Sequence, residues 1–156
     1  MTEKMGFNEL PLKKKYGNVP VHAEIGGKEC NFRSKLEYRW AQHLEFCRLA
    51  GLIKDWSYET HTFRFEKAGV KQYTPDFVIR NLDGTFEYHE TKGMVTKFDI
   101  DKLKAVWEEY PDSKITLIFW RRPKLSTQKR TKLERYCHGI RWNVAKDISK
   151  EPIDLS

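Results

Sequence analysis

One pair of short segments constrains the fold of this chain more than any other feature of its sequence. Residues 73–77 read YTPDF, and residues 89–93 read HETKG. Between them lie two runs rich in β-branched and aromatic residues, separated by the polar residues 81–84. This is the pattern of two short strands joined by a tight turn. The sequence therefore predicts a β-hairpin that brings the two segments together.

The turn of this hairpin decides which residues lie opposite each other. A three-residue loop needs a residue in the left-handed conformation, and Gly84 supplies it. Such a loop pairs Asn81 with Thr85. Counting back along both strands then pairs Asp76 with Glu90, so two carboxylates are expected side by side.

Alternation along the second strand adds a lysine to this carboxylate pair. Glu90 and Lys92 share one face of the strand, and Thr91 points away. Two carboxylates provide the hard oxygen ligands that Mg²⁺ prefers, and a neighbouring lysine can orient an attacking water. Asp76 and Glu90 are therefore predicted metal ligands, with Lys92 a catalytic residue in phosphodiester hydrolysis. In the alternative interpretation, Asp76 bonds a turn, and Glu90 and Lys92 are solvated charges.

Composition favours one folded domain in a reducing compartment. The 156 residues are 39% hydrophobic and 13% aromatic, which is enough to build a core. Three scattered cysteines form no motif and cannot all pair, which favours a cytoplasmic protein. No apolar run is long enough to cross a membrane, and the first residues do not resemble a signal peptide. Neither membrane insertion nor export is expected.

The net charge of +7 predicts a polyanionic partner and is concentrated near the C-terminus. Residues 120–150 contain ten Lys or Arg and two acids, a local charge of +8, which leaves 7 − 8 = −1 for the remainder. We call residues 120–150 the basic lobe. A solvated basic face is the alternative. The candidate DNA contacts are Arg33, Lys35, Arg121, Arg122, Lys124, Lys129, Arg130, Lys132 and Arg135.

Periodicity along the chain predicts an α/β fold with a mixed sheet flanked by helices. A basic N-terminal arm, either in contact with DNA or solvated, and a short tail border the main domain. The expected domain bounds are 1–31, 32–150 and 151–156. The arm is expected to hold at most a short hairpin, at 19–25 and 28–32. Helices are expected at 34–50, 98–110 and 126–138, and further strands at 56–58, 60–66 and 114–120. The connection from 86 to 120 is a strand–helix–strand crossover, so its two strands should be parallel.

Glu37 lies three residues after Ser34, at the start of the first expected helix. This spacing is that of a capping box, in which the glutamate would bond the Ser34 backbone N–H. Glu37 also borders the apolar stripe of the helix, so its side chain is expected to face the rest of the fold.

The order of four segments resembles the PD-(D/E)xK nuclease superfamily and, within it, the phage endonuclease I family. These segments are FRSKLE at 32–37, YTPDF at 73–77, ETKG at 90–93 and YCHGI at 136–140. The resemblance implies a restriction-endonuclease-like fold, Glu37 as a further site residue and metal ligand, and the Thr91 backbone carbonyl as a third ligand. It also implies a Mg²⁺ or Mn²⁺ cofactor and a homodimer that resolves branched DNA such as Holliday junctions.

The sequence of this chain departs from the family's pattern at residues 66–72. Relatives of this family exchange a strand across an extended, proline-containing bridge, whereas this chain has Lys67, Ala68 and Gly69 there. Because Gly69 tolerates positive φ, a closed hairpin is the local preference, although a dimer is still expected.

The residue pattern alone thus predicts a phosphodiesterase that acts on nucleic acid, and the resemblance implies a metal-dependent DNA endonuclease selective for branched DNA. One alternative is a phage nuclease that nicks or degrades ordinary duplex DNA. Another is a non-catalytic DNA-binding protein on a nuclease scaffold, which would use only the basic lobe.

Overall fold

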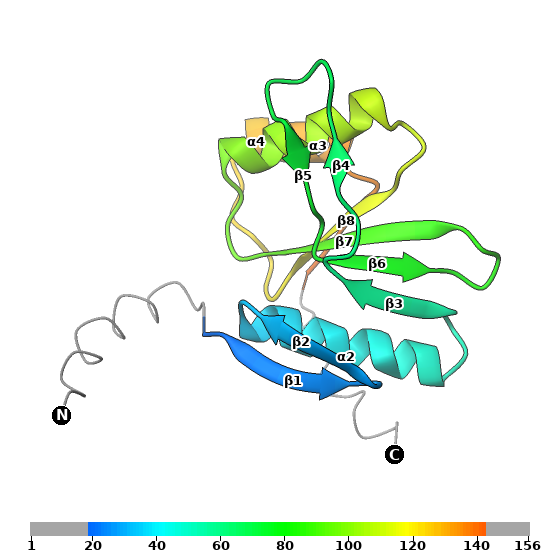
Figure 1. Ribbon diagram of the computed structural model, residues 1–156. Coiled ribbons are helices and arrows are strands. Elements are labelled where there is room, and N and C mark those ends of the chain that lie inside the picture. The colour runs from blue at the N-terminus through cyan, green and yellow to red at the C-terminus, as the bar shows by residue number, and fades with distance from the viewer. Residues whose placement is uncertain (1–18, 143–156) are drawn as a thin grey trace, which may run out of the picture.

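The computed structural model describes residues 19–142, which form an α/β fold around a five-stranded sheet (Figure 1). The strands lie in the order β3-β6-β7-β8-β9. Their bounds are β3 Asp55–Tyr58, β6 Phe77–Arg80, β7 Phe86–Lys92, β8 Ile115–Phe119 and β9 Gly139–Arg141. β6 pairs antiparallel with both β3 and β7, whereas β8 pairs parallel with both β7 and β9. The predicted mixed sheet and parallel crossover are confirmed.

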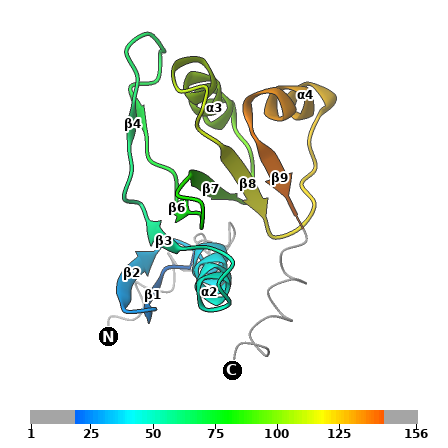
Figure 2. The ribbon, with the colours of Figure 1, turned by 90° about the vertical axis from the view of Figure 1, so that its right-hand side faces the viewer.

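Helices cover both faces of this sheet (Figure 2). They are α2 Lys35–Leu49, α3 Lys97–Glu109 and α4 Thr127–Tyr136. Strand β8, buried along its whole length, separates two hydrophobic cores. Leu117 and Phe119 pack into the core beneath α3 and α4, and Ile118 packs into the core beneath α2. This arrangement agrees with the restriction-endonuclease-like fold that the sequence predicts.

The β6–β7 hairpin has the predicted turn and register. The Asn81 N–H donates to the Thr85 carbonyl over 2.8 Å, and Gly84 has a φ of +89°. The ladder pairs Phe77 with His89. One step further along both strands, Asp76 lies opposite Glu90. A turn three residues long therefore sets the position of both carboxylates.

Helix α2 begins and ends close to its predicted bounds. The Ser34 hydroxyl accepts a hydrogen bond from the Glu37 N–H over 3.2 Å, and Gly51 follows the helix with a φ of +76°. The predicted hydrogen bond from the Ser34 backbone N–H to the Glu37 carboxylate is wrong. The Glu37 carboxylate accepts from the backbone N–H of Arg33 over 2.9 Å in place of that of Ser34. Glu37 is buried, as its place beside the apolar stripe predicts.

The N-terminal hairpin forms at the predicted place. β1 (Val21–Ile25) pairs antiparallel with β2 (Lys28–Phe32) across Gly26 and Gly27, both of which have positive φ. Phe32 is fully buried in the core beneath α2. Residues 19–31 of the predicted arm therefore join the fold. The rest of the arm and the tail at 151–156 lie outside the described residues.

The segment that differs from the family forms a closed hairpin within one chain. β4 (Phe63–Arg64) pairs antiparallel with β5 (Gln72–Tyr73), so the strand predicted at 60–66 is only two residues long. The closed hairpin preferred by the local sequence is present, but Gly69 does not adopt the positive φ that it tolerates. Instead, the Glu109 carboxylate accepts three successive N–H groups, those of residues 66, 67 and 68, over 2.8 to 3.0 Å.

Two details near the C-terminal half differ from prediction. Helix α4 ends at Tyr136, and Gly139 begins strand β9 opposite Thr116 rather than ending the helix. In α3, helical periodicity predicts Trp107 on the buried face, but Trp107 is 46% exposed, and its ring packs against that of Tyr136 with the centroids 5.2 Å apart. No helix among residues 19–142 is long and apolar enough to span a membrane.

Candidate active site

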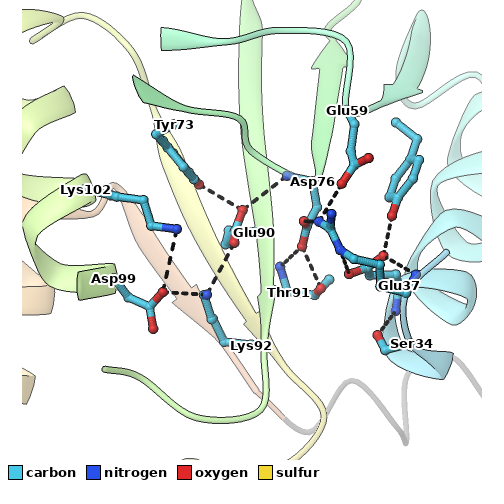
Figure 3. A network of polar contacts seen from close by, with 12 residues as sticks. Ser34, Glu37, Glu59, Tyr73, Asp76, Glu90, Thr91, Lys92, Asp99 and Lys102 are labelled. Atoms are coloured by element: carbon cyan, nitrogen blue, oxygen red, sulfur yellow. Dashed lines mark hydrogen bonds and ion pairs between the residues drawn. The ribbon is translucent and has the colours of Figure 1, made fainter. Parts of the chain in front are cut away.

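The candidate site lies where β6 begins and β7 ends (Figure 3). Asp76 directly precedes β6, and Glu90, Thr91 and Lys92 are the last residues of β7. The side chains of Asp76, Glu90 and Thr91 are buried, with Asp76 only 2% exposed. Buried carboxylates are rare unless cations or hydrogen-bond donors compensate them. The contacts of each acid therefore reveal the chemistry of the site.

Asp76 is held by strand β7 and by a cation. Its Oδ2 accepts from the Thr91 N–H over 2.8 Å and from the Thr91 hydroxyl over 2.7 Å. Its Oδ1 accepts from the Arg33 Nη2 over 3.3 Å. Thr91 thus points away from Glu90 and Lys92, as alternation predicts, and it binds the other carboxylate.

Glu90 is joined to Asp76 through the backbone. Its Oε1 accepts from the Asp76 N–H over 3.1 Å and from the Tyr73 hydroxyl over 2.9 Å. Its Oε2 lies 3.5 Å from the Lys92 Nζ. The predicted convergence of Glu90 and Lys92 on one face is therefore present. Asp76 meets Glu90 through its backbone N–H, whereas its carboxylate is bonded to Thr91 (Figure 3).

Lys92 has a second partner, Asp99, which sequence reasoning missed. The Lys92 Nζ donates to the Asp99 Oδ1 over 2.6 Å, and the other Asp99 oxygen accepts from the N–H and hydroxyl of Thr96. Thr96 and Asp99 form the capping box at the start of α3. The spacing Thr-x-x-Asp was visible in the sequence. A cap alone accounts for that spacing, so it gave no sign of a link to Lys92. Lys102, also missed, lies 3.9 Å from Asp99.

Glu37 reaches the site through Arg33. The Tyr58 hydroxyl donates to Glu37 over 2.5 Å, and the Arg33 Nε lies 3.8 Å from the second Glu37 oxygen. The Arg33 Nη2 also pairs with Glu59 over 2.5 Å, a residue whose φ of +54° is unusual for a side chain with a Cβ. Arg33, a candidate DNA contact, thus joins three carboxylates, those of Glu37, Glu59 and Asp76.

Burial raises the pKa of both Asp76 and Glu90, and repulsion from neighbouring carboxylates adds to the rise for Asp76. Burial, followed by the charges of Glu90 and Glu37, raises the pKa of Asp76 to about 8. Burial also raises the pKa of Glu90, although Lys92 and the Tyr73 hydroxyl oppose that rise. Burial lowers the pKa of Lys92, but Glu90 and Asp99 outweigh it and the net pKa is raised. Lys92 is therefore a stable cation, and the carboxylates still favour additional positive charge.

The donor set fits a magnesium-type ion. Among residues 19–142, no three side chains of His, Cys, Asp or Glu gather as a metal cluster. A metal centre here would use the carboxylates of Asp76 and Glu90 together with main-chain and water oxygens. Mg²⁺ is commonly held by one or two carboxylates and keeps several waters, so this set suits it.

Most of the remaining candidate DNA contacts are exposed. Lys129 is the exception, because its Nζ donates to the Val95 carbonyl over 2.8 Å, in the loop that follows β7. Lys35 lies in the first turn of α2. The exposed residues of the segment 120–126 and of α4 are Arg121, Arg122, Lys124, Arg130, Lys132 and Arg135.

Comparison with known proteins identifies the family of this chain. The family described as phage endonuclease I matches residues 20–151, which include every strand and helix of the fold and all the residues of the acidic site. A comparison with curated proteins gives no match. Since the match extends over most of the sequence, the chain belongs to the phage endonuclease I family.

Proposed function

We propose that this protein is a metal-dependent DNA endonuclease that resolves branched DNA. The observation that carries the proposal is the buried Asp76–Glu90 pair with Lys92 beside it. Asp76, Glu90 and the Thr91 backbone carbonyl would hold Mg²⁺ or Mn²⁺, with Glu37 joining a second metal or the water network. The bound metal would stabilise charge on the phosphorus oxygens and activate water. We assign the pattern to the PD-(D/E)xK superfamily.

Lys92 has the position and charge for a transition-state role. Asp99 and Glu90 fix its ammonium group from two sides, over 2.6 and 3.5 Å. A fixed ammonium can donate to an attacking water or to a phosphate oxygen without reorganising during the reaction. Thr91 keeps the Asp76 carboxylate in place through two donors. These residues form a preorganised site.

Family membership supports the choice of branched DNA and of a homodimer. A four-way junction has approximate two-fold symmetry, and cutting it on two strands requires two active sites related by a two-fold axis. Nicking or degradation of ordinary duplex DNA is the second candidate, supported by the same acidic site. A non-catalytic DNA-binding protein is the third, but the intact set of Asp76, Glu90 and Lys92 argues against it.

One experiment separates these functions. Purified protein is incubated with a radiolabelled four-way junction or with its linear arms, in Mg²⁺ or in EDTA. We expect paired nicks near the branch in Mg²⁺ only. Equal cleavage of the linear arms would favour the duplex nuclease, and binding without cleavage would favour the non-catalytic protein.

Variants assign the cleavage to the site. Asp76→Asn should abolish cleavage and retain junction binding, because the carboxylate charge that it removes would hold the metal and repel phosphate. Asp112→Asn is the matched control, since that carboxyl is exposed between α3 and β8. Near wild-type cleavage by Asp76→Asn would refute the site assignment.

A further inference from the structure

A cavity of about 270 Å³ lies outside the acidic site, between α4, β9 and the segment that joins β8 to α4. Its walls include the apolar side chains of Leu125, Leu133 and Ile140. Arg122, Arg130 and Trp142 also line it. None of the residues of the acidic site lines this cavity. Its volume is below the range of pockets that hold drug-sized ligands, and it suits a single ring system.

Trp142 supplies an aromatic surface at this cavity. Its side chain is 39% exposed, and the Arg122 guanidinium lies 5.4 Å from its ring centroid. Such a cation–π pair holds the indole beside a charged group. Nucleic-acid bases stack on exposed aromatic rings, and every base has a π-face that can do so.

The charges around the cavity complement a phosphate. Among residues 19–142, no ion pair occupies Arg122 or Arg130, whereas Arg33 and Lys92 are both paired with carboxylates. Both arginines belong to the basic lobe. Glu134 also lines the cavity, so the lining arginines outnumber the lining acids by two to one. A guanidinium with no carboxylate partner is a good ligand for phosphate.

We propose that this cavity binds one unpaired nucleotide of the DNA substrate. The base stacks on Trp142, and the adjoining phosphate lies between Arg122 and Arg130. A base inside a duplex is stacked and paired, so only an unpaired base can enter. A gap or a single strand provides one, and a junction provides one when a base pair at the branch opens. The inference deepens the proposed function, because it rests on DNA being the substrate.

The test measures binding of the full-length protein in EDTA, where no metal-dependent cleavage interferes. Two probes are compared by fluorescence anisotropy: a short single strand with one central 2-aminopurine, and the same strand in a perfect duplex. The variants are Trp142→Ala and Trp142→Phe, with Trp107→Ala as the matched control. Trp107 is also exposed, but it lies on α3.

We expect Trp142→Ala to weaken single-strand binding by roughly 5- to 100-fold, equivalent to about one stacked base, and to change duplex binding by less than about twofold. Trp142→Phe should retain most of the affinity, and Trp107→Ala should retain all of it. The wild type and Trp142→Phe should quench the 2-aminopurine fluorescence, and Trp142→Ala should not.

Two results would overturn the proposal. One is an equal decrease of single-strand and duplex affinity in Trp142→Ala, and the other is unquenched 2-aminopurine in the wild-type complex. Failure of the proposed function is distinguishable, because these measurements do not involve hydrolysis. A protein that shows Trp142-dependent binding but cleaves nothing would refute only the nuclease activity.

Discussion

The buried carboxyl of Asp76 makes stability depend on pH. Its pKa is about 8 in the folded protein, against an ordinary 3.8, so the folded state binds this proton more tightly. The free energy of unfolding should therefore fall as pH rises from about 4 to about 8, as the folded state gains a buried charge. Asp76→Asn removes that charge and keeps the acceptor for Thr91.

Thermal unfolding in EDTA at several pH values checks this prediction. Asp76→Asn should unfold at about the wild-type temperature at pH 5 and at a temperature higher by a few degrees at pH 9. Adding Mg²⁺ at pH 9 should stabilise the wild type and leave the variant unchanged, because the ion binds only the folded, charged site. A melting difference that is the same at every pH would contradict this account.

Lys92 is the second residue whose role can be isolated. Lys92→Met keeps the aliphatic stem and removes the ammonium group. If the lysine orients water or stabilises the transition state, the cleavage rate should fall by about 100-fold or more. Metal affinity, measured by titration calorimetry, should change little. An undiminished rate would make Lys92 a structural residue.

Asp99 positions Lys92, so its replacement should change how cleavage depends on pH. The negative charge of Asp99 helps to raise the pKa of Lys92. Asp99→Asn should lower the cleavage rate and move the alkaline limb of the rate profile to lower pH. The control is Asp101→Asn, which breaks only the exposed pair with Lys97. A lower cleavage rate with an unchanged alkaline limb would indicate that Asp99 only caps helix α3 and does not set the pKa of Lys92.

Among the helices and strands, those specified by neighbouring residues could be predicted from the sequence, whereas those that depend on distant residues could not. The Asp76–Glu90 register followed from alternation and one glycine, because both act within 15 residues. Strand β9 was missed because three residues have no periodicity of their own, and its pairing partner β8 is distant in sequence. Contacts of Asp99 and Arg33 depend on packing between elements, which spacing within one element does not encode.

The β4–β5 hairpin gives a test of a single element. Glu109 binds the N–H groups of residues 66–68 and so fastens the hairpin to the end of α3. Glu109→Ala removes the acceptor of all three hydrogen bonds. We expect faster amide hydrogen exchange at residues 66–68, because an opened turn exposes these groups to water. Glu108→Ala is the control, since Glu108 pairs weakly with Lys104 on the exposed side of the helix.

The same variant addresses the oligomeric state. If closure of the hairpin competes with exchange of a strand between chains, Glu109→Ala should raise the dimer fraction. Sedimentation at micromolar protein, with and without junction DNA, measures this. A wild-type particle that stays near 18.6 kDa and binds the junction one to one would exclude the obligate dimer. If amide hydrogen exchange at residues 66–68 is the same in Glu109→Ala as in the wild type, Glu109 does not hold the turn closed.

For the whole molecule, charge separation matters more than net charge. The acidic site repels phosphate, whereas the basic lobe contains all of the excess positive charge. Attraction by exposed cations can bring the backbone to the carboxylates only if those cations are not already paired. Arg33 is paired within the site. Among the described residues, Lys132 and Arg135 of α4 are exposed and have no ion pair.

The dependence of DNA binding on salt tests whether the basic lobe binds phosphate. Every cation that no longer neutralises a phosphate should flatten the slope of log K against log salt by roughly 0.9 on duplex arms, so Lys132→Gln with Arg135→Gln should flatten it by about 1.8. The control pair is Lys54→Gln with Lys71→Gln, which are exposed, lie outside the basic lobe and have no ion pair among the described residues. Each pair lowers the net charge from +7 to 7 − 2 = +5. We expect only the α4 pair to change the slope, as measured by anisotropy in EDTA. Equal flattening by both pairs would mean that net charge, and not the basic lobe, governs binding.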